Sequence, residues 1–215
     1  MTTLNCMTTT IRNHSKNLRS VLGLFAMSIA LLCPLQAQAQ LMDGGTRSLM
    51  NRYTGTVLGN GGSAVAGTQL NTSIWLITNP TQHFRFFFDS SLQFVGNFFL
   101  ITTLNFPGKQ SGFAVDVLGH STNWLFPIIQ GMPDNTNFQR WNVIKVFDTG
   151  VQPNLIGWFQ LKNRGTGMCL MDFGNPGTGG AAVQDFCDTT NQRQLWSMWM
   201  WDSAAAGETG GHWVP

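Results

Sequence analysis

The chain has 215 residues, of which only 10% are Asp, Glu, Lys or Arg, and its formal net charge is +2. Three of its basic residues lie within the first 39, and beyond them nine Lys and Arg face ten Asp and Glu. A nearly neutral chain without a basic run lacks the electrostatic signature of nucleic-acid-binding proteins. The abundance of Gly, Asn, Thr and aromatic residues is typical of a compact all-β domain with tight turns.

The first 39 residues have the pattern of an export signal. A basic lead-in precedes an apolar run at residues 21–32, and Ala37-Gln38-Ala39 offers a cleavage site. The run is shorter than the ~20 apolar residues that span a bilayer, and a retained membrane anchor is the alternative. Cys33 suggests lipoprotein anchoring, but the large Leu32 before it disfavours that processing. We therefore expect a secreted or periplasmic chain, without a stable membrane span once residues 1–39 are removed.

Two cysteines remain in the mature part, Cys169 and Cys187. In an exported chain such a pair most often forms one disulfide, and two buried free thiols are the alternative. Closing a loop of this length stabilises a fold by ~3 kcal/mol in the loop-entropy view.

Along the mature chain, residues 40–52 form a predicted lead-in, and short β-strands separated by Gly, Asn and Pro follow from Tyr53. No long segment has helical periodicity, and the tail at residues 203–215 is predicted to be mobile. The expected strands lie at residues 56–58, 73–78, 84–88, 98–104, 112–119, 138–144, 158–162, 169–174, 183–187 and 194–199.

A short motif recurs three times at nearly equal spacing: Gln82-His83-Phe84, Gln139-Arg140-Trp141 and Gln194-Leu195-Trp196. The spacing predicts one structural unit used three times, at residues ~53–95, ~96–148 and ~156–201 of a domain spanning residues 53–202. Asp116 and Asp172 align, since they lie 23 and 22 residues before their glutamines. By the same alignment Thr56 stands at the aspartate position of the first unit, and Phe113 stands at the position of Cys169.

Three units of about four strands, each ending in Gln-x-Trp or Gln-x-Phe, resemble the ricin B-type lectins. The resemblance implies an all-β β-trefoil fold that binds carbohydrate, with no catalysis and no cofactor. It also implies that the motif is structural: the aromatic residue packs in the core and the glutamine ties strands together. The structural residues expected on this basis are Gln82, Phe84, Trp141 and Trp196.

Residues ~98–200 also resemble the A subunit of cytolethal distending toxins. The match includes Asn123-Trp124-Leu125-Phe126 and the run from Trp158 into Cys169, although the units come in a different order. This resemblance implies a non-catalytic cell-binding subunit with other toxin subunits as partners. Trp124 and Phe126, two positions apart, would lie on one strand face, as core residues or as a patch for a receptor or partner subunit.

A sugar site needs carboxylates or amides for hydroxyl groups and an aromatic face for the sugar ring. In the third unit the candidates are Asp172, Gln184, Asp185, Phe186, Asn191 and Gln194, with Trp199 as a second aromatic residue. In the second unit they are Asp116, Gln130, Asn137 and Gln139.

Both sets depart from the ricin-type pattern. Asp172 follows Cys169 by three positions instead of two, with Met171 at the expected place, and a shift of one residue in a strand reverses the side-chain face unless a bulge intervenes. The Asn that precedes the motif glutamine in sugar-binding repeats is replaced in all three units, by Thr81, Phe138 and Arg193.

Signals for catalysis or metal binding are weak in the sequence. None of His83, His120 and His212 shows metal-ligand spacing, and no nucleophile motif is present. We therefore predict a secreted β-trefoil that attaches to extracellular or cell-surface glycans, without a metal site or enzymatic activity. The alternatives are the toxin-type cell-binding subunit and a secreted hydrolase fragment or inhibitor built on the same scaffold.

Overall fold

The computed structural model describes residues 45–76, 79–92, 98–104, 110–146, 157–201 and 211–213. The predicted export signal lies outside these ranges. Within them the regular elements are β-strands and single 3-10 turns, which agrees with the all-β prediction. None of the helical turns in the described ranges has the length and apolar character needed to cross a bilayer.

Six antiparallel strands form a closed barrel. Each pairs with the next along the series, and the last pairs with the first, so that the ring has no open edge. The barrel strands are β1 (Thr46–Asn51), β4 (Phe84–Phe88), β5 (Phe98–Leu104), β8 (Arg140–Val146), β9 (Trp158–Asn163) and β12 (Trp196–Trp201).

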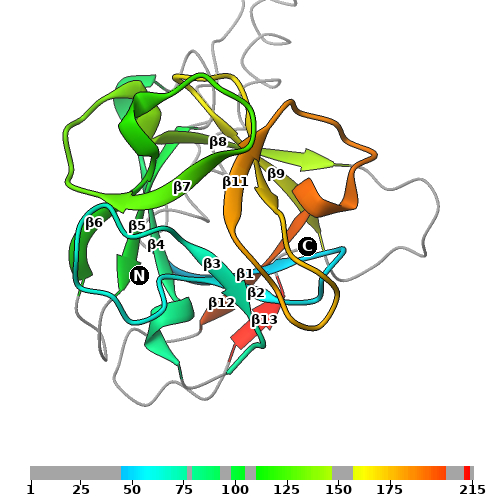
Figure 1. The fold of residues 1–215 in the computed structure, drawn as a ribbon. Helices are drawn as coiled ribbons and strands as arrows, with labels where there is room; N and C mark the ends of the chain where they lie inside the picture. The colour runs from blue at the N-terminus through cyan, green and yellow to red at the C-terminus, as the bar shows by residue number, and fades with distance from the viewer. Residues whose placement is uncertain are drawn as a thin grey trace, which may run out of the picture. The chain divides into compact units, whose positions relative to one another are not determined.

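Three hairpins complete the fold, one between each pair of barrel strands that belong to the same unit. In each hairpin the first strand pairs with the barrel strand before it. The result is three four-stranded units around a common barrel, which is the β-trefoil arrangement (Figure 1). The hairpin strands are β2 (Val57–Gly59) with β3 (Asn71–Ser73), β6 (Gln110–Val117) with β7 (Phe126–Gly131), and β10 (Cys169–Asp172) with β11 (Ala182–Asp185).

Two boundaries differ from the prediction. The predicted lead-in at residues 40–52 contains β1, which closes the barrel by pairing with β12 over five residues. The predicted mobile tail contains β13 (Gly211–Trp213), which pairs with the outer end of β12. The alternation of polar and apolar residues in Thr46–Asn51 is irregular, with Arg47 and Ser48 both buried, so periodicity gave no sign of this strand.

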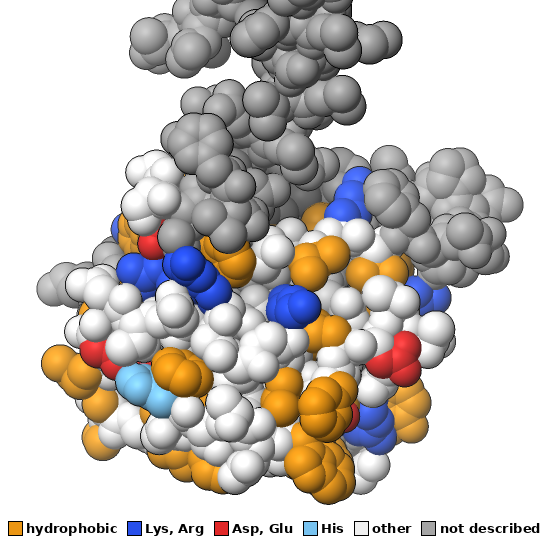
Figure 2. Space-filling view, turned by 90° about the horizontal axis from the view of Figure 1, so that it is seen from above, with side chains coloured by type: hydrophobic (Ala, Val, Ile, Leu, Met, Phe, Trp, Pro, Cys, Tyr) orange, Lys and Arg blue, Asp and Glu red, His pale blue; other side chains and the backbone are white. Residues whose placement is uncertain are grey.

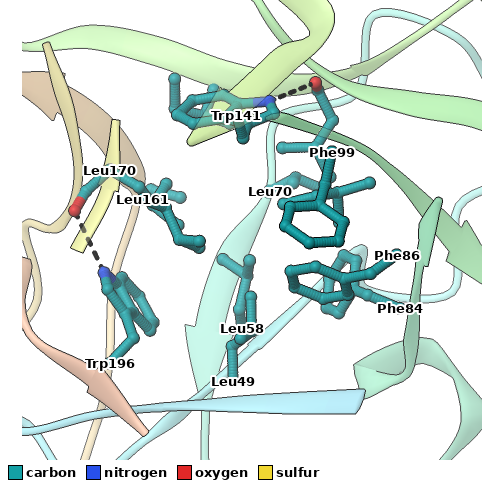
Figure 3. Packing of buried hydrophobic residues seen from close by; sticks show 14 of the residues in the cluster. Leu49, Leu58, Leu70, Phe84, Phe86, Phe99, Trp141, Leu161, Leu170 and Trp196 are labelled. Atoms are coloured by element: carbon teal, nitrogen blue, oxygen red, sulfur yellow. Dashed lines mark hydrogen bonds between the residues drawn. The ribbon is translucent and has the colours of Figure 1, made fainter. Parts of the chain in front are cut away.

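The aromatic residues of the three motifs lie in the core, as predicted. Phe84, Trp141 and Trp196 are fully buried and belong to one hydrophobic core cluster (Figure 3). The indole Nε1 of Trp141 donates to the carbonyl of Val115 at 2.8 Å, and that of Trp196 donates to the carbonyl of Leu170 at 3.1 Å. Each indole therefore joins the last barrel strand of its unit to the hairpin, a bond that Phe84 has no donor to make.

The three motif glutamines are buried at the ends of short 3-10 turns, η1 (Pro80–Gln82), η4 (Asn137–Gln139) and η5 (Gln192–Gln194). Each side-chain amide forms two hydrogen bonds with the backbone segment that follows the hairpin. Its nitrogen donates to one carbonyl, and its oxygen accepts from the N–H two residues later. The carbonyls belong to Ile74, Met132 and Phe186, and the N–H groups to Leu76, Asp134 and Asp188. The structural role predicted for Gln82 thus applies to all three glutamines.

The predicted disulfide between Cys169 and Cys187 is confirmed, with a Cα–Cα distance of 5.0 Å. It joins the start of β10 to the segment after β11 and so reinforces the third hairpin. Disulfides persist in oxidising compartments, so this bond is compatible with an extracellular or periplasmic location.

We expect Trp141→Phe to lower the free energy of unfolding by about 1–2 kcal/mol, because it keeps most of the ring in the core but leaves the carbonyl of Val115 without its indole donor. Trp141→Ala should cost about 3–5 kcal/mol, since it adds a cavity. Urea unfolding of both variants checks the difference. Equal losses for the two variants would contradict a separate contribution from the indole hydrogen bond.

Candidate functional site

Strand register defines which residues of the three units are equivalent. In the hairpins Leu58 pairs with Thr72, Val115 with Gln130, and Leu170 with Gln184. Val115 and Leu170 are also the two carbonyl acceptors for the motif tryptophans, so two independent criteria give the same alignment. The next position in each unit faces away from the core, and it is occupied by Gly59, Asp116 and Met171.

This alignment corrects the one based on spacing. Asp172 is equivalent to Asn60 and Val117, one residue beyond Asp116, and Gly59 rather than Thr56 occupies the aspartate position of the first unit. By the same register Ala114, rather than Phe113, is the counterpart of Cys169. The pairing of β10 with β11 has no bulge, so the one-residue shift does reverse the face of Asp172.

Asp172 is completely buried and supports the fold. Its carboxylate accepts hydrogen bonds from the hydroxyls of Thr54 at 2.6 Å and Thr56 at 3.1 Å, and from the N–H of Gly174 at 2.8 Å. These contacts join the third unit to the turn after β1. A carboxylate engaged in this way is not presented to an external sugar.

Gln130 and Gln184, two more predicted sugar ligands, also face inward and are completely buried. The amide of Gln130 donates to the carbonyls of Ser63 and Val65, and that of Gln184 donates to those of Ser121 and Asn123. Each glutamine therefore fastens a loop of the preceding unit to its own hairpin. Gln130 and Gln184 therefore join neighbouring units, whereas Gln139 and Gln194 form hydrogen bonds within their own units.

The outer surface of the third unit has an exposed aromatic residue but no carboxylate at the position equivalent to Asp116. Phe186 is 68% exposed, whereas Met171, which occupies the position equivalent to Asp116, is buried. Asn191 caps η5 by accepting from the N–H of Arg193, and its amide nitrogen contacts the sulfur of Met171 at 3.8 Å. Asp185 accepts from the N–H of Phe186 at 2.8 Å. The predicted residues of this unit are thus divided between the outer surface and the interior.

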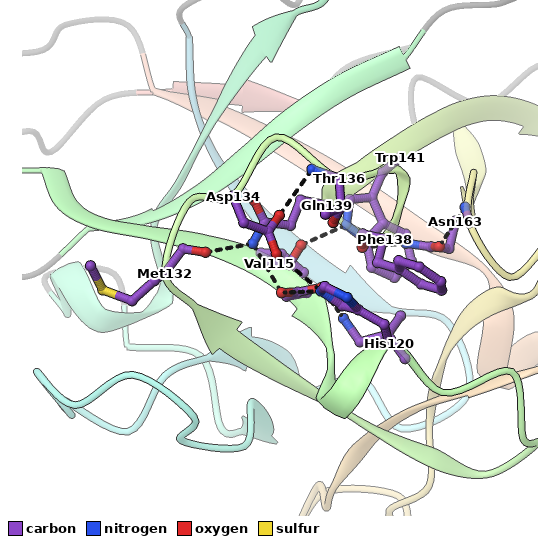
Figure 4. A network of polar contacts seen from close by, with 12 residues as sticks. Val115, His120, Met132, Asp134, Thr136, Phe138, Gln139, Trp141 and Asn163 are labelled. Carbon is purple, nitrogen blue, oxygen red and sulfur yellow. Dashed lines mark hydrogen bonds and ion pairs between the residues drawn. The ribbon is translucent and has the colours of Figure 1, made fainter.

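The second unit places a carboxylate at the outer position. Asp116 is only 5% exposed, and its Oδ1 accepts from the N–H of Val117 at 2.7 Å while Oδ2 accepts from the amide of Gln139 at 2.9 Å. The Nε2 atom of His120 lies 3.6 Å from Oδ2 of Asp116 and 3.1 Å from Oδ2 of Asp134 (Figure 4). We refer to Asp116, His120 and Asp134 as the outer cluster.

The surroundings hold the outer cluster in place. The imidazole of His120 is stacked on Phe138 with ring centroids 4.5 Å apart and an interplanar angle of 2°. Gly131 leaves room for Asp116, because a Cβ atom there would lie 2.6 Å from its Oδ2. His120 itself has a positive φ of 54°, an uncommon conformation for a residue other than glycine, which bends the chain after β6.

The two carboxylates of the outer cluster have opposite pKa shifts. Burial raises the pKa of Asp116, and the hydrogen bonds from Gln139 and Val117 offset this effect only in part. Burial also acts to raise the pKa of Asp134, but the hydrogen bonds from Thr136 and the charge of His120 outweigh it and lower the pKa. Asp116 is thus a carboxylate whose ionised form is incompletely compensated in the folded protein.

The outer cluster was not predicted as a group from the sequence. Asp116 was a candidate, but His120 was judged to lack metal-ligand spacing, and the structure places its Nε2 between two carboxylates within 4.8 Å of one another. The spacing of Asp116 and His120, four residues apart, was an available signal. Asp134 could not be found in this way, because the β6–β7 hairpin separates it from the others. The predicted Asn137 is exposed on η4, beside this region.

In the first unit, a cavity of about 270 Å³ lies at Gly59, the position equivalent to Asp116. It exists where the other units place a side chain, since Gly59 contributes none. Its walls are uncharged and include Asn71, Ser73, Asn79 and Thr81. The cavity and the outer cluster therefore occupy equivalent places on different units. The carboxylates of the cluster are the better ligands for hydroxyl groups, because carboxylates bind them more strongly than neutral amides do.

Of the two residues in the predicted aromatic patch, Trp124 is largely exposed and Phe126 is not. Trp124 is 62% exposed, but it lies in the turn before β7, and Leu125 between it and Phe126 has a positive φ of 54°. The two rings therefore do not lie on one strand face as predicted, and Phe126 is half-buried. On the face shown in Figure 2, uncharged side chains and backbone predominate, and a histidine lies between hydrophobic and acidic side chains.

Comparison with known proteins supports the fold. No protein-family profile matches the chain, and no curated protein matches it either. Among solved structures, the designed three-fold symmetric protein ThreeFoil superposes with a TM-score of 0.57 at 21% identity, covering 72% of this chain and 97% of ThreeFoil. The chain has the β-trefoil fold. The β-trefoil fold implied by the resemblance to ricin B-type lectins is therefore confirmed.

Two natural proteins contain a similar domain. The Polyporus squamosus lectin, solved with a human-type influenza-binding epitope, matches with a TM-score of 0.52 at 18% identity, over 73% of this chain and 49% of the lectin. An exo-beta-1,3-galactanase from Clostridium thermocellum matches with a TM-score of 0.57 at 21% identity, over 73% of this chain and 30% of the enzyme. The chain thus spans about half of the lectin and less than a third of the galactanase.

We expect Asp172→Ala to lower the free energy of unfolding by about 3 kcal/mol, because it leaves the hydroxyls of Thr54 and Thr56 and one N–H without their shared acceptor. Asp185→Ala is the matched control on the same hairpin and should change stability by less than about 1 kcal/mol. Chemical denaturation measures both. A stable Asp172→Ala variant with altered ligand binding would return Asp172 to the binding site.

The raised pKa of Asp116 predicts a pH-dependent effect on stability. Its folded-state pKa exceeds the ordinary 3.8, so its stabilising contribution is complete below that pH and is lost as the pH rises. The Tm of Asp116→Asn, taken relative to that of the unmodified protein, should therefore increase between pH 3 and pH 7. Asp134→Asn should show the opposite trend, because the pKa of Asp134 is lowered. Parallel Tm curves for the unmodified protein and both variants would contradict the two shifts.

Proposed function

We propose that this chain is an exported, non-catalytic glycan-binding module whose primary site is the outer cluster of the second unit. The observation that carries the proposal is the outward carboxylate of Asp116, with His120 and Asp134 at its rim. The side chains of His120 and Asp134 are 37% and 36% exposed, so they are accessible to a ligand above Asp116. Three groups that can exchange hydrogen bonds with vicinal hydroxyls converge on one spot.

The second unit also has an exposed apolar side chain, two residues before Asp134. Met132 follows β7 directly and its side chain is largely exposed, while its carbonyl is fixed by the amide of Gln139. A sugar ring presents hydroxyls at its edge and C–H groups on its face, so polar and apolar surfaces side by side suit it. In the third unit Phe186 occupies the position equivalent to Met132, but Met171 gives no carboxylate there.

The structural neighbours are consistent with this role. The Polyporus squamosus lectin was solved with a bound glycan epitope, and the galactanase is named for its action on a polysaccharide. In both proteins the part similar to this chain is one portion of a longer molecule. A β-trefoil domain therefore occurs in proteins that bind or act on carbohydrate, and the outer cluster gives this chain chemistry suited to such a ligand.

Export is part of the proposal and rests on two features. The first 39 residues have the pattern of a cleavable signal, and the Cys169–Cys187 disulfide fits an oxidising compartment. Extracellular or cell-surface glycans are then the accessible partners.

One observation favours a second candidate function, that of a cell-binding toxin subunit. Trp124 is a large aromatic residue, and aromatic side chains at such exposure are common in protein interfaces. A mosquitocidal holotoxin also contains a similar domain, with a TM-score of 0.57 at 13% identity over 73% of this chain and 17% of the toxin. In this alternative Trp124 contacts a receptor or partner subunit, and the sugar site is secondary.

A glycan array probed with the purified mature chain tests the main proposal, followed by titration of the best glycan. We expect Asp116→Asn to weaken binding at least ~10-fold, because a buried carboxylate that accepts hydroxyl groups contributes more than a neutral amide. Trp124→Ala should leave glycan binding unchanged. Absence of binding to any glycan would refute the proposal.

Two further variants test the choice of unit. Asn71→Tyr fills the cavity of the first unit, and Phe186→Ala removes the exposed ring of the third. Neither should affect binding if the second unit is the primary site. Loss of binding in one of them, with normal binding in Asp116→Asn, would move the site to that unit.

A further inference from the structure

The outer cluster brings together three different metal-ligand atoms. Oδ2 of Asp116, Nε2 of His120 and Oδ2 of Asp134 all lie within 4.8 Å of one another. We propose that these three residues bind a divalent transition-metal ion, with Zn²⁺ as the best-suited ion. This site goes beyond the proposed glycan binding and does not depend on it.

The distances suit a tetrahedral ion. Zn–N and Zn–O bonds of ~2.0–2.1 Å in a tetrahedron separate neighbouring ligand atoms by about 3.3 Å. The Nε2 atom of His120 lies 3.1 Å and 3.6 Å from the two carboxylate oxygens, which brackets that value. The two carboxylate oxygens lie within 4.8 Å of each other, and the partly exposed side chain of Asp134 can move toward the ion. The ion would replace the proton that now joins the imidazole to a carboxylate.

The ligands are already oriented by hydrogen bonds and stacking. Of these contacts, the one from Gln139 reaches a ligand atom, Oδ2 of Asp116, and a carboxylate oxygen can accept a hydrogen bond and bind a metal ion at the same time. Gln139 and the N–H of Val117 fix the carboxylate of Asp116, and the N–H of Thr136 binds the other oxygen of Asp134 at 2.9 Å. The imidazole of His120 is held flat against Phe138. Outer contacts of this kind reduce the cost of ordering metal ligands and are a regular part of metal sites.

The donor set favours zinc over calcium or magnesium. An imidazole nitrogen with two carboxylates is typical of Zn²⁺ and related ions, whereas Ca²⁺ and Mg²⁺ prefer oxygen ligands alone, in greater number. Three protein ligands leave one tetrahedral position for water or for a ligand hydroxyl, and the exposure of His120 and Asp134 makes that position accessible. The charge of the ion would also compensate the buried Asp116.

Among the residues that the structure describes, this ligand set occurs in the second unit and not in the other two. Gly59 and Met171 stand at the positions equivalent to Asp116, and neither side chain supplies a carboxylate there. The third unit does keep a counterpart of Asp134. Asp188 donates its N–H to the motif glutamine and accepts from Thr190, just as Asp134 does with Gln139 and Thr136. Asp188 therefore provides a matched control.

Titration calorimetry of ZnCl₂ into the chelator-treated mature chain tests the site. We expect one Zn²⁺ per chain, and at least ~10-fold weaker binding in His120→Asn and in Asp134→Asn. Asp188→Asn should bind Zn²⁺ as the unmodified protein does. Circular dichroism of each variant confirms that the fold is retained.

Three results would overturn the cation site: no Zn²⁺ binding, Zn²⁺ binding that survives both His120→Asn and Asp134→Asn, or CaCl₂ binding as tightly as ZnCl₂. Repeating the glycan titration with and without Zn²⁺ separates this inference from the proposed function. Glycan binding without Zn²⁺ binding would leave the glycan proposal standing alone. Zn²⁺ binding without any glycan ligand would leave the cation site standing alone.

Discussion

The buried amides of Gln82, Gln139 and Gln194 are the contacts on which the outer surface of this trefoil depends. Each amide donates to one backbone carbonyl and accepts from one backbone N–H of the segment after its hairpin. A buried amide without partners is costly, so the segment is held at a fixed distance from the barrel. The residues that flank each candidate site are placed by this contact, including Met132, Asp134 and Phe186.

The same contact explains how one fold can keep three units with different chemistry. The glutamine binds only backbone atoms of the segment, so the side chains there are free to vary. At one equivalent position the units carry Ile74, Met132 and Phe186, and at the next such position Leu76, Asp134 and Asp188. The framework is therefore constant, while the surface of each unit is set by a few outward residues.

Much of the fold could be predicted from the sequence, because the motif repeats and the cysteine pair constrain it strongly. The strands at Phe84–Phe88 and Phe98–Leu104 were predicted with the bounds that the structure shows. The strand at Thr46–Asn51 was missed because it is the closing strand of a barrel, buried by contacts with β12 that lie far away in the sequence. Local periodicity contains no information about such a partner.

The candidate site could be predicted only in part, because successive side chains of a strand point to opposite faces. Asp116 and Asp172 differ by one residue in their distance from the motif glutamine, and in a regular strand one residue exchanges the outer face for the core. The sequence identified the shift at Asp172 but could not tell whether a bulge compensates for it. Asp134 was inaccessible to sequence reasoning for another cause, because it reaches the cluster across a hairpin. The spacing of His120 from Asp116 was an available signal, but the contact depends on a turn at positive φ that the sequence does not reveal.

The energetics of Asp116 give a physical reason to regard the second unit as the functional one. A carboxylate whose pKa is raised by burial is a stability cost at neutral pH, and the fold does not require it, since Gly59 and Met171 occupy the same position in the other units. Asp172, by contrast, is satisfied by three donors and joins two units. Costly polar groups that the fold does not need are concentrated at functional sites. A ligand that brings hydroxyl groups or a cation to Asp116 would supply the compensation that the folded chain lacks.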